Sequence, residues 1–122
     1  MGYTNYYYQE RDFTDNEFED LIDECMYVKE LGFDIKFHTD LVKKGSKKVS
    51  EVNLITLDGE CETLVLRKYR RTKKSYEDEN LSFDFCKTRM AKYDLAVWHL
   101  LCSCNKLLGK DFSISRDRPW IS

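Results

Sequence analysis

Residues 83–97, FDFCKTRMAKYDLAV, hold the side chains best suited to chemistry. Lys87, Thr88 and Arg89 stand in succession where an alternating aromatic segment gives way to an apolar helical pattern. Amides at the start of a helix bind anions, and a neighbouring lysine and arginine strengthen that preference. Thr88 could donate its hydroxyl to a ligand or could cap the helix, and the residues leave both open. Asp94, expected in the first helical turn, is favoured there by the helix dipole.

A covalent mechanism would require a nucleophile, and Cys86 is the candidate in this stretch. A thiol between a strand and a helix can have a lowered pKa, because helix amides favour the thiolate. Cys86, however, is out of phase with Phe83 and Phe85 in the alternating segment, and neither histidine of the chain is marked as its base. We interpret Cys86 as a structural thiol, and a hydrolase using Cys86 or Asp94 is the weakest hypothesis.

The cysteines and the N-terminal sequence bear on metals and on compartment. An odd number of cysteines without a C-x-x-C pair favours free thiols in a reducing cytosol. The first residues lack the layout of a signal peptide, and no apolar run has the length of a membrane span. We expect a cytoplasmic protein with no metal, no cofactor and no membrane partner. The cysteines are Cys25, Cys61, Cys86, Cys102 and Cys104.

The overall charge limits the partners. The chain has 20 lysines and arginines against 22 aspartates and glutamates, a formal net charge of −2, so nucleic acid is not an expected partner. Any anion site must therefore be local. The densest basic tract, residues 67–74, is followed by acidic residues 77–79. We interpret this tract as a solvated strand end rather than a nucleic-acid site.

A tyrosine-rich segment near the N-terminus could supply a planar surface. With the period of a strand, Tyr6 and Tyr8 share one face with Thr4, and Tyr3 and Tyr7 share the other. Such rings can line a pocket for a planar ligand or pack within a sheet, and packing is the expectation for at least half of them.

Local signals predict the elements that position these residues. A capping box at Thr14 and Glu17 begins a helix whose apolar spacing stops at Gly32, and a second helix is predicted over residues 93–108. Asp58 and Gly59 predict a hairpin between β-rich runs. We predict a single domain over residues 1–122, with an α+β fold in two layers. Its mainly antiparallel sheet is expected to have about five strands, with two helices on one face. The expected strands lie around residues 3–9, 33–38, 52–57, 63–69, 81–85 and 112–114.

Three segments carry a further pattern: MGYT-x-Y at residues 1–6, F-x-F-C-K-T with a later Y-D at residues 83–94, and FSIS with an aspartate and a tryptophan at residues 112–120. In these segments the chain resembles an uncharacterised family of small proteins from bacteria and their phages. Members usually read G-Y-T-H-Y, F-C-K-T-A-R-K-P-Y-D and I-S-S-D-G. Here Asn5 replaces the histidine, residues 90–92 replace R-K-P, and Arg116 and Arg118 replace a serine and a glycine.

No established activity comes with this family, so the resemblance implies the location of a site rather than a reaction. If the N-terminal strand, the FCKT turn and the C-terminal strand are neighbours in the sheet, their polar groups are expected to converge on one pocket. The expected ligand-binding residues are Tyr3, Thr4, Tyr6, Lys87, Thr88, Arg89, Tyr93, Asp94, Ser115, Asp117 and Trp120.

Two functions of different classes fit these observations. The first is a small phage-type protein, not an enzyme, that binds and sequesters an anionic, nucleotide-derived ligand and so counters host defence signalling. Lys87, Thr88 and Arg89 would contact phosphates while Tyr3 or Tyr6 stacks on a base, and a homo-oligomer would suit such a protein. The second is a protein-interaction module that inhibits a host enzyme through the charged residues 43–79.

Overall fold

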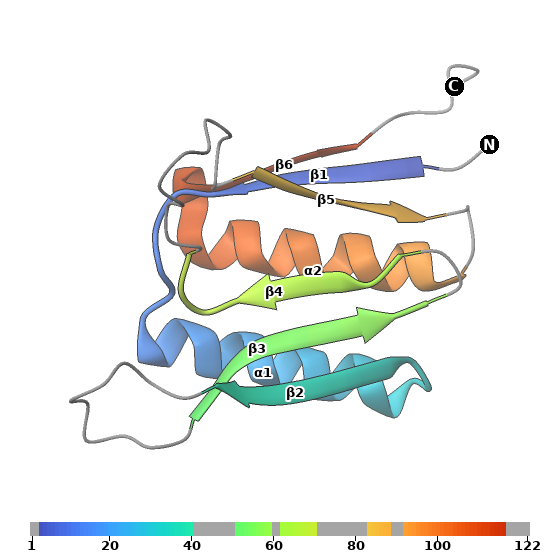
Figure 1. Ribbon diagram of the computed structural model, residues 1–122, viewed down its shortest axis with the longest axis horizontal. Coiled ribbons are helices and arrows are strands. Elements are labelled where there is room, and N and C mark those ends of the chain that lie inside the picture. The colour runs from blue at the N-terminus through green and yellow to red at the C-terminus, as the bar shows by residue number, and fades with distance from the viewer. Residues whose placement is uncertain (1–2, 41–50, 60–61, 71–82, 89–91, 117–122) are drawn as a thin grey trace.

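The computed structural model describes residues 3–40, 51–59, 62–70, 83–88 and 92–116, and its arrangement is shown in Figure 1. Both predicted helices are present and the α+β class is confirmed. The elements are β1 (Tyr3–Gln9), α1 (Asp15–Glu30), β2 (Asp34–Asp40), β3 (Glu51–Asp58), β4 (Leu64–Arg67), β5 (Phe83–Thr88), α2 (Lys92–Leu108), the short 3₁₀ helix η1 (Gly109–Asp111) and β6 (Phe112–Arg116).

The strands form two antiparallel sheets of three strands each, so the prediction of one sheet of about five strands is wrong. Chain neighbours pair in the order β2-β3-β4, with the predicted hairpin joining β3 and β4. The other sheet has the order β5-β1-β6, and thus places strands from near both ends of the described chain side by side (Figure 1). α1 contacts β2, α2 contacts β6, and the two helices contact each other.

The two sheets stay separate because side chains occupy the edge of β5 that lies toward β4. The Phe85 N–H donates to the Asp84 carboxylate at 2.8 Å, and the Lys87 N–H donates to the Glu62 carboxylate at 2.8 Å. The Tyr93 hydroxyl lies 3.0 Å from the Lys87 carbonyl. These contacts satisfy backbone groups that another strand would need, so β4 cannot extend the β5-β1-β6 sheet.

Helix α1 begins and ends as its sequence predicts. The Thr14 hydroxyl accepts the Glu17 N–H at 3.2 Å, and the Glu17 carboxylate accepts the Thr14 N–H at 2.9 Å, which confirms the capping box. After the helix, Gly32 has a φ of 107°, a conformation that costs glycine little. The buried side of α1 consists of Phe18, Leu21, Cys25 and Val28.

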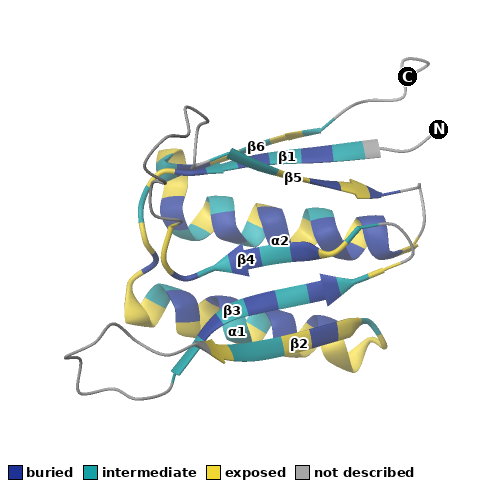
Figure 2. Cartoon of the chain, in the orientation of Figure 1, coloured by how far each residue is buried: buried dark blue, intermediate teal, exposed yellow. Residues whose placement is uncertain are grey.

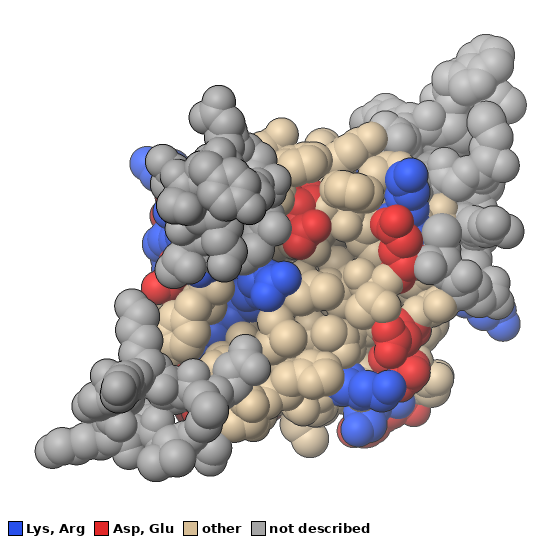
Figure 3. Space-filling model, in the orientation of Figure 1, with Lys and Arg blue, Asp and Glu red and all other residues tan. Residues whose placement is uncertain are grey.

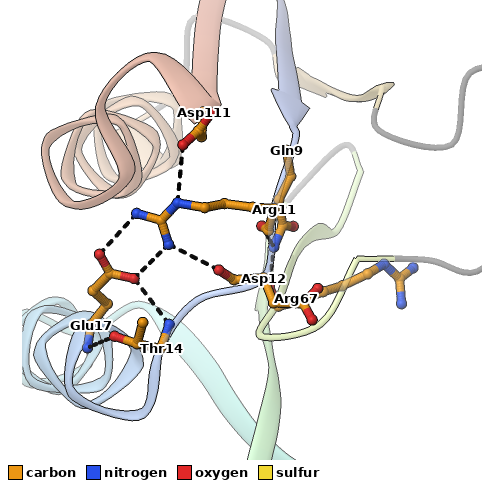
Figure 4. Close-up of polar contacts among 7 residues, drawn as sticks. All are labelled: Gln9, Arg11, Asp12, Thr14, Glu17, Arg67 and Asp111. Carbon is orange, nitrogen blue, oxygen red and sulfur yellow. Dashed lines mark hydrogen bonds and ion pairs between the residues drawn. The ribbon is translucent and has the colours of Figure 1, made fainter.

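Arg11 joins the start of α1 to η1, just before β6 (Figure 4). Its guanidinium makes two hydrogen bonds to Glu17, at 2.9 and 3.0 Å, and one to Asp111 at 3.0 Å. The hydrogen bonds from Arg11 lower the pKa of Glu17 to about 2. Close by, the Gln9 amide donates to the Arg67 carbonyl at 2.9 Å and so connects β1 with β4. This corner therefore holds both sheets and a helix terminus together.

The core lies between the sheets and the helices. Figure 2 shows buried positions alternating along β3 and β4 and recurring along both helices. α2 is enclosed along most of its length; its buried residues are Tyr93, Asp94, Ala96, Val97, Leu100, Leu101, Cys104 and Leu108. Among the described residues, no helix combines the length and apolar character needed to cross a bilayer.

Tyr93 links the β3–β4 hairpin to the end of β5. Its hydroxyl accepts the Glu62 N–H at 3.0 Å and donates toward the carbonyls of Glu62 and Lys87, each at 3.0 Å. The ring lies against Gly59 so closely that a Cβ atom at position 59 would stand 2.3 Å from two of its carbon atoms. The hairpin therefore requires glycine at this position for reasons of space.

Replacing Gly59 with alanine should destabilise the fold by about 1–3 kcal/mol, because the methyl group forces the Tyr93 ring out of position. Chemical denaturation of Gly59→Ala, Tyr93→Ala and the double variant measures this effect. The double variant should lose less stability than the sum of the single variants, since the clash is absent without the ring. Strict additivity of the two changes would contradict the contact.

Candidate functional site

The β5-β1-β6 sheet brings together the three segments expected to form the site. Thr4 on β1 pairs with Lys87 on β5, and Tyr6 pairs with Phe85 on one side and with Ser115 of β6 on the other. The FCKT segment, the N-terminal strand and the last strand are thus direct neighbours.

The predicted site residues of this sheet divide between its two faces, because successive residues of a strand point in opposite directions. The outer face, away from the helices, carries Thr4, Tyr6, Lys87 and Ser115, all half-buried or exposed. Thr88 is fully buried on the inner face. Lys87 and Thr88 therefore cannot contact one ligand from the same side of the sheet.

On the inner face, the Asp94 carboxylate gathers hydrogen bonds from three strands. It is only 4% exposed and accepts from the Thr88 hydroxyl, the Arg116 guanidinium and, at 3.2 Å, the Asn5 amide nitrogen. The donors come from β5, β6 and β1 respectively, while Asp94 belongs to the first turn of α2. Polar groups of the three segments therefore meet here around a buried carboxylate, whereas the sequence predicted that they would meet in a ligand pocket.

Electrostatics keep Asp94 ionised. Burial alone would raise its pKa, but the hydrogen bonds from Thr88, Arg116 and Asn5 outweigh burial, and the net pKa is lowered. The Arg116 guanidinium also lies over the Trp98 ring, 4.6 Å from its centroid. The charge of Arg116 is thus compensated within the fold rather than offered to a ligand.

Thr88 is not the cap of α2. It is the last residue of β5, and α2 begins only at Lys92, which excludes the N-cap, one of the two alternatives that the sequence left open for Thr88. Its hydroxyl instead donates to Asp94 across the junction. The Thr88 side chain thereby connects the end of β5 to the first turn of α2 within the core.

Asn5 and Arg116 are not among the site residues predicted from the sequence. Asn5 is fully buried; its Nδ2 also donates to the Cys86 carbonyl at 3.4 Å, while its Oδ1 has no hydrogen-bond partner among the described residues. The available signal was that both lie in segments expected to form the site, since Asn5 follows Thr4 and Arg116 follows Ser115. Both side chains donate to Asp94.

The outer face carries a row of aromatic rings. Phe83 is the centre of the row: its centroid lies 6.1 Å from Tyr6, 5.0 Å from Tyr8 and 6.1 Å from Phe85. The Phe83 and Phe85 rings are stacked with 29° between their planes, and Phe85 is 43% exposed. Lys87, the next residue of β5 on this face, is exposed. The row therefore ends in an accessible ring followed by an ammonium group.

The other predicted residues lie inside the fold or outside the described part. Tyr93 is buried and links the hairpin to β5. Tyr3 pairs with Thr88 where β1 lies beside β5, and this pairing gives the position of the Tyr3 backbone but not of its side chain. Arg89, Asp117 and Trp120 lie outside the described residues.

Neither described histidine pairs with Cys86, the candidate nucleophile. Cys86 is fully buried, with its thiol 3.6 Å from the Glu62 carbonyl. His38 is hydrogen-bonded to Thr56, and His99 is hydrogen-bonded to Glu24 on α1. None of the four described cysteines is in a disulfide, and the same part of the chain holds no group of three His, Cys, Asp or Glu residues placed to bind a metal. Cys61 lies outside this part.

A second polar site surrounds Lys68, which the sequence placed in a solvated tract. Lys68 is only 4% exposed, so that interpretation is wrong for this residue; residues 71–74 of the tract lie outside the described part. Its ammonium group bonds Asp15 and lies 3.4 Å from Glu51. Burial opposes the charge, but the hydrogen bonds of Lys68, chiefly to Asp15, raise its pKa above the usual value. A cavity of about 250 Å³ adjoins this group, lined by Asp15, Phe18, Glu19, Ile22, Glu51, Val52 and Lys68.

Surface charge is mixed in the view of Figure 3. Described lysines and arginines stand there in small groups beside aspartates and glutamates, and the described residues in this view show no broad basic surface. This distribution agrees with the net charge of −2 and leaves local contacts as the means of binding an anion.

Replacing Asp94 with asparagine should destabilise the protein by about 2–4 kcal/mol at neutral pH, because Arg116 then lacks its buried counterion. The pKa of Asp94 is lower in the folded chain than in the unfolded chain. Its contribution is therefore complete above the ordinary carboxyl pKa of about 3.9 and is lost as the pH falls through the folded value.

Urea denaturation of both proteins between pH 3 and pH 7 measures this dependence. The difference between wild type and Asp94→Asn should narrow below about pH 4. A difference that stays constant over this range would show that the charge of Asp94 is irrelevant to stability.

No family model, curated protein or solved structure matches this chain in the three comparisons made.

Proposed function

We propose that this protein binds a small nucleotide-derived anion on the outer face of the β5-β1-β6 sheet. The proposal rests on the order of side chains along one face of β5, where the stacked Phe83 and Phe85 rings are followed by Lys87. The base stacks on Phe85 and the phosphate contacts Lys87. The protein sequesters this ligand and does not convert it.

Stacking supplies the contact to the base. Phe85 is supported from behind by Phe83, which is in turn packed by Tyr6 and Tyr8, so the exposed ring is held in place before a ligand arrives. A base that continues this row keeps its flat face out of water, and such stacking contributes about 1–3 kcal/mol per base. Tyr6 thereby acts as a support for the stacking ring rather than as the ring itself.

Contacts to phosphate come from the end of the same face. Lys87, whose side chain ends in an ammonium group, is the next residue after Phe85 on this face of β5. Thr4, its cross-strand neighbour, offers a hydroxyl. The Glu62 carboxylate is bound to the Lys87 N–H at 2.8 Å and adds negative charge nearby. A ligand with few phosphates suits this balance better than a polymer does.

The inner Asp94 network positions this surface without touching the ligand. Thr88 is held by Asp94, which fixes the end of β5 and hence the position of Lys87 beside it. This arrangement separates the rigid contacts on the inner face from the exposed contacts on the outer face. Sequestration in place of turnover agrees with the enclosed state of Cys86 and Asp94, which are the nucleophile and carboxylate of the weaker hydrolase hypothesis.

Phe85→Ala and Lys87→Ala should each weaken binding about tenfold or more, through lost stacking and lost ion pairing respectively. The measurement is titration calorimetry against a panel of cyclic and linear adenosine and guanosine nucleotides at low salt. Leu95→Ala and Lys110→Ala are matched controls, because both side chains are exposed away from the aromatic row, and they should bind like wild type. The proposal fails if no nucleotide binds or if all four variants behave alike.

Heating the loaded protein distinguishes binding from catalysis. Release of intact ligand supports sequestration, and release of an altered ligand supports a hydrolase. The alternative function is inhibition of a host enzyme through residues 43–79, about half of which lie outside the described residues. A stoichiometric protein partner recovered from host lysate, with no nucleotide effect on stability, would favour that alternative.

A further inference from the structure

The two edges of the β5-β1-β6 sheet differ. On β5, Asp84, Glu62 and Tyr93 occupy outward backbone groups, as described above. On β6, the segment from Phe112 to Ser115 has no proline and no charged side chain. Natural sheets use prolines, charged side chains or occupied backbone groups to prevent an exposed edge from pairing with another chain. An edge without these features is available for pairing.

The hydrogen-bond phase of β6 identifies the residue whose backbone faces outward. The Glu10 N–H donates to the Asp111 carbonyl at 2.7 Å, which makes these two residues a hydrogen-bonded pair. Counting by two along the register, Ser113 and Ser115 face β1 with their backbone groups. Phe112, Ile114 and Arg116 therefore direct their N–H and C=O groups away from the sheet.

Ile114 is the outward residue whose backbone is open. The Phe112 N–H donates to the Gly109 carbonyl, and the Phe112 carbonyl accepts the Asn105 amide at 2.8 Å. For Ile114, neither outward group is hydrogen-bonded to another described residue. The Ile114 side chain is half-buried against the core and holds this part of β6 in place. The outward N–H and C=O groups of Ile114 are not held in this way.

Helix α2 runs beside the same edge of the sheet. Trp98 contacts Arg116, and Asn105 contacts Phe112, so the side of α2 that carries Trp98 and Asn105 runs along β6. Cys102 lies between them on this side of the helix and is exposed. The described residues therefore leave both the strand edge and the helix beside it accessible.

We propose that the edge of β6 pairs antiparallel with β6 of a second copy of this chain. An antiparallel edge is self-complementary about a two-fold axis: with the axis at Ile114, each Ile114 N–H donates to the Ile114 carbonyl of the other copy. Ser113 then lies opposite Ser115 of the other copy, where hydroxyl pairs are favourable. The product is a continuous six-stranded sheet with both aromatic rows on one side.

The interface is small, because β6 has five residues and one side of α2 lies beside it. Small interfaces are typical of complexes that form and separate reversibly. The dimer should therefore form reversibly at micromolar concentrations. Because it involves no ligand contact, it is tested on the ligand-free protein, and its failure would leave the proposed nucleotide site untouched.

Ile114→Pro should abolish the dimer, because proline removes the outward N–H while the intramolecular ladder uses Ser113 and Ser115. Ile114→Val keeps the N–H and is the matched control. Sedimentation equilibrium should show wild type and Ile114→Val in concentration-dependent exchange between monomer and dimer, with Ile114→Pro monomeric. Circular dichroism checks that each variant is folded.

Amide hydrogen exchange gives a second measurement that needs no variant. The Ile114 amide should exchange quickly in dilute protein and more slowly, by tenfold or more, at concentrations where the dimer forms. A protein that is monomeric at every concentration with a fast Ile114 amide overturns the proposal. Protection of Ile114 that is independent of concentration also overturns it, since the same chain would then cover the edge.

Discussion

The burial of one ionised carboxylate constrains much of this structure. Asp94 can remain charged within the core only if several donors reach it together, because an unpaired buried charge is costly. Its donors Asn5, Thr88 and Arg116 come from three strands. A shift of any strand by one residue would turn its donor to the opposite face. The network thus links strand register to the position of α2.

Local parts of the fold could be predicted from the sequence, because their causes lie within a few residues. The capping box at Thr14, the glycine after α1 and the Asp58-Gly59 hairpin are such cases. The division into two sheets could not be predicted, since it depends on Glu62 and Tyr93, from other parts of the chain, reaching the edge of β5 in three dimensions. Lys68 was misread for the same reason: its acidic neighbours come from distant segments.

The candidate site shows a similar limit. The sequence indicated which segments meet, but adjacent residues in a strand serve different faces, so Lys87 and Thr88 have separate surroundings. Alternation of Phe83 and Phe85 is typical of a core-facing strand, yet Cys86 and Thr88 are the buried residues of β5. The aromatic rings lie instead on the outer face, where they pack on one another. Hydrophobic pattern alone gives the period of a strand but not which face is covered.

The closed edge of β5 has a consequence for how copies of the chain can assemble through this sheet. Growth of a β-fibril requires two available edges on every subunit, so that each added copy presents a new one. Here Asp84 and Glu62 terminate one edge of the β5-β1-β6 sheet. Pairing through its other edge would therefore end at two copies, because a sheet with a single available edge cannot add strands repeatedly in the direction of its hydrogen bonds.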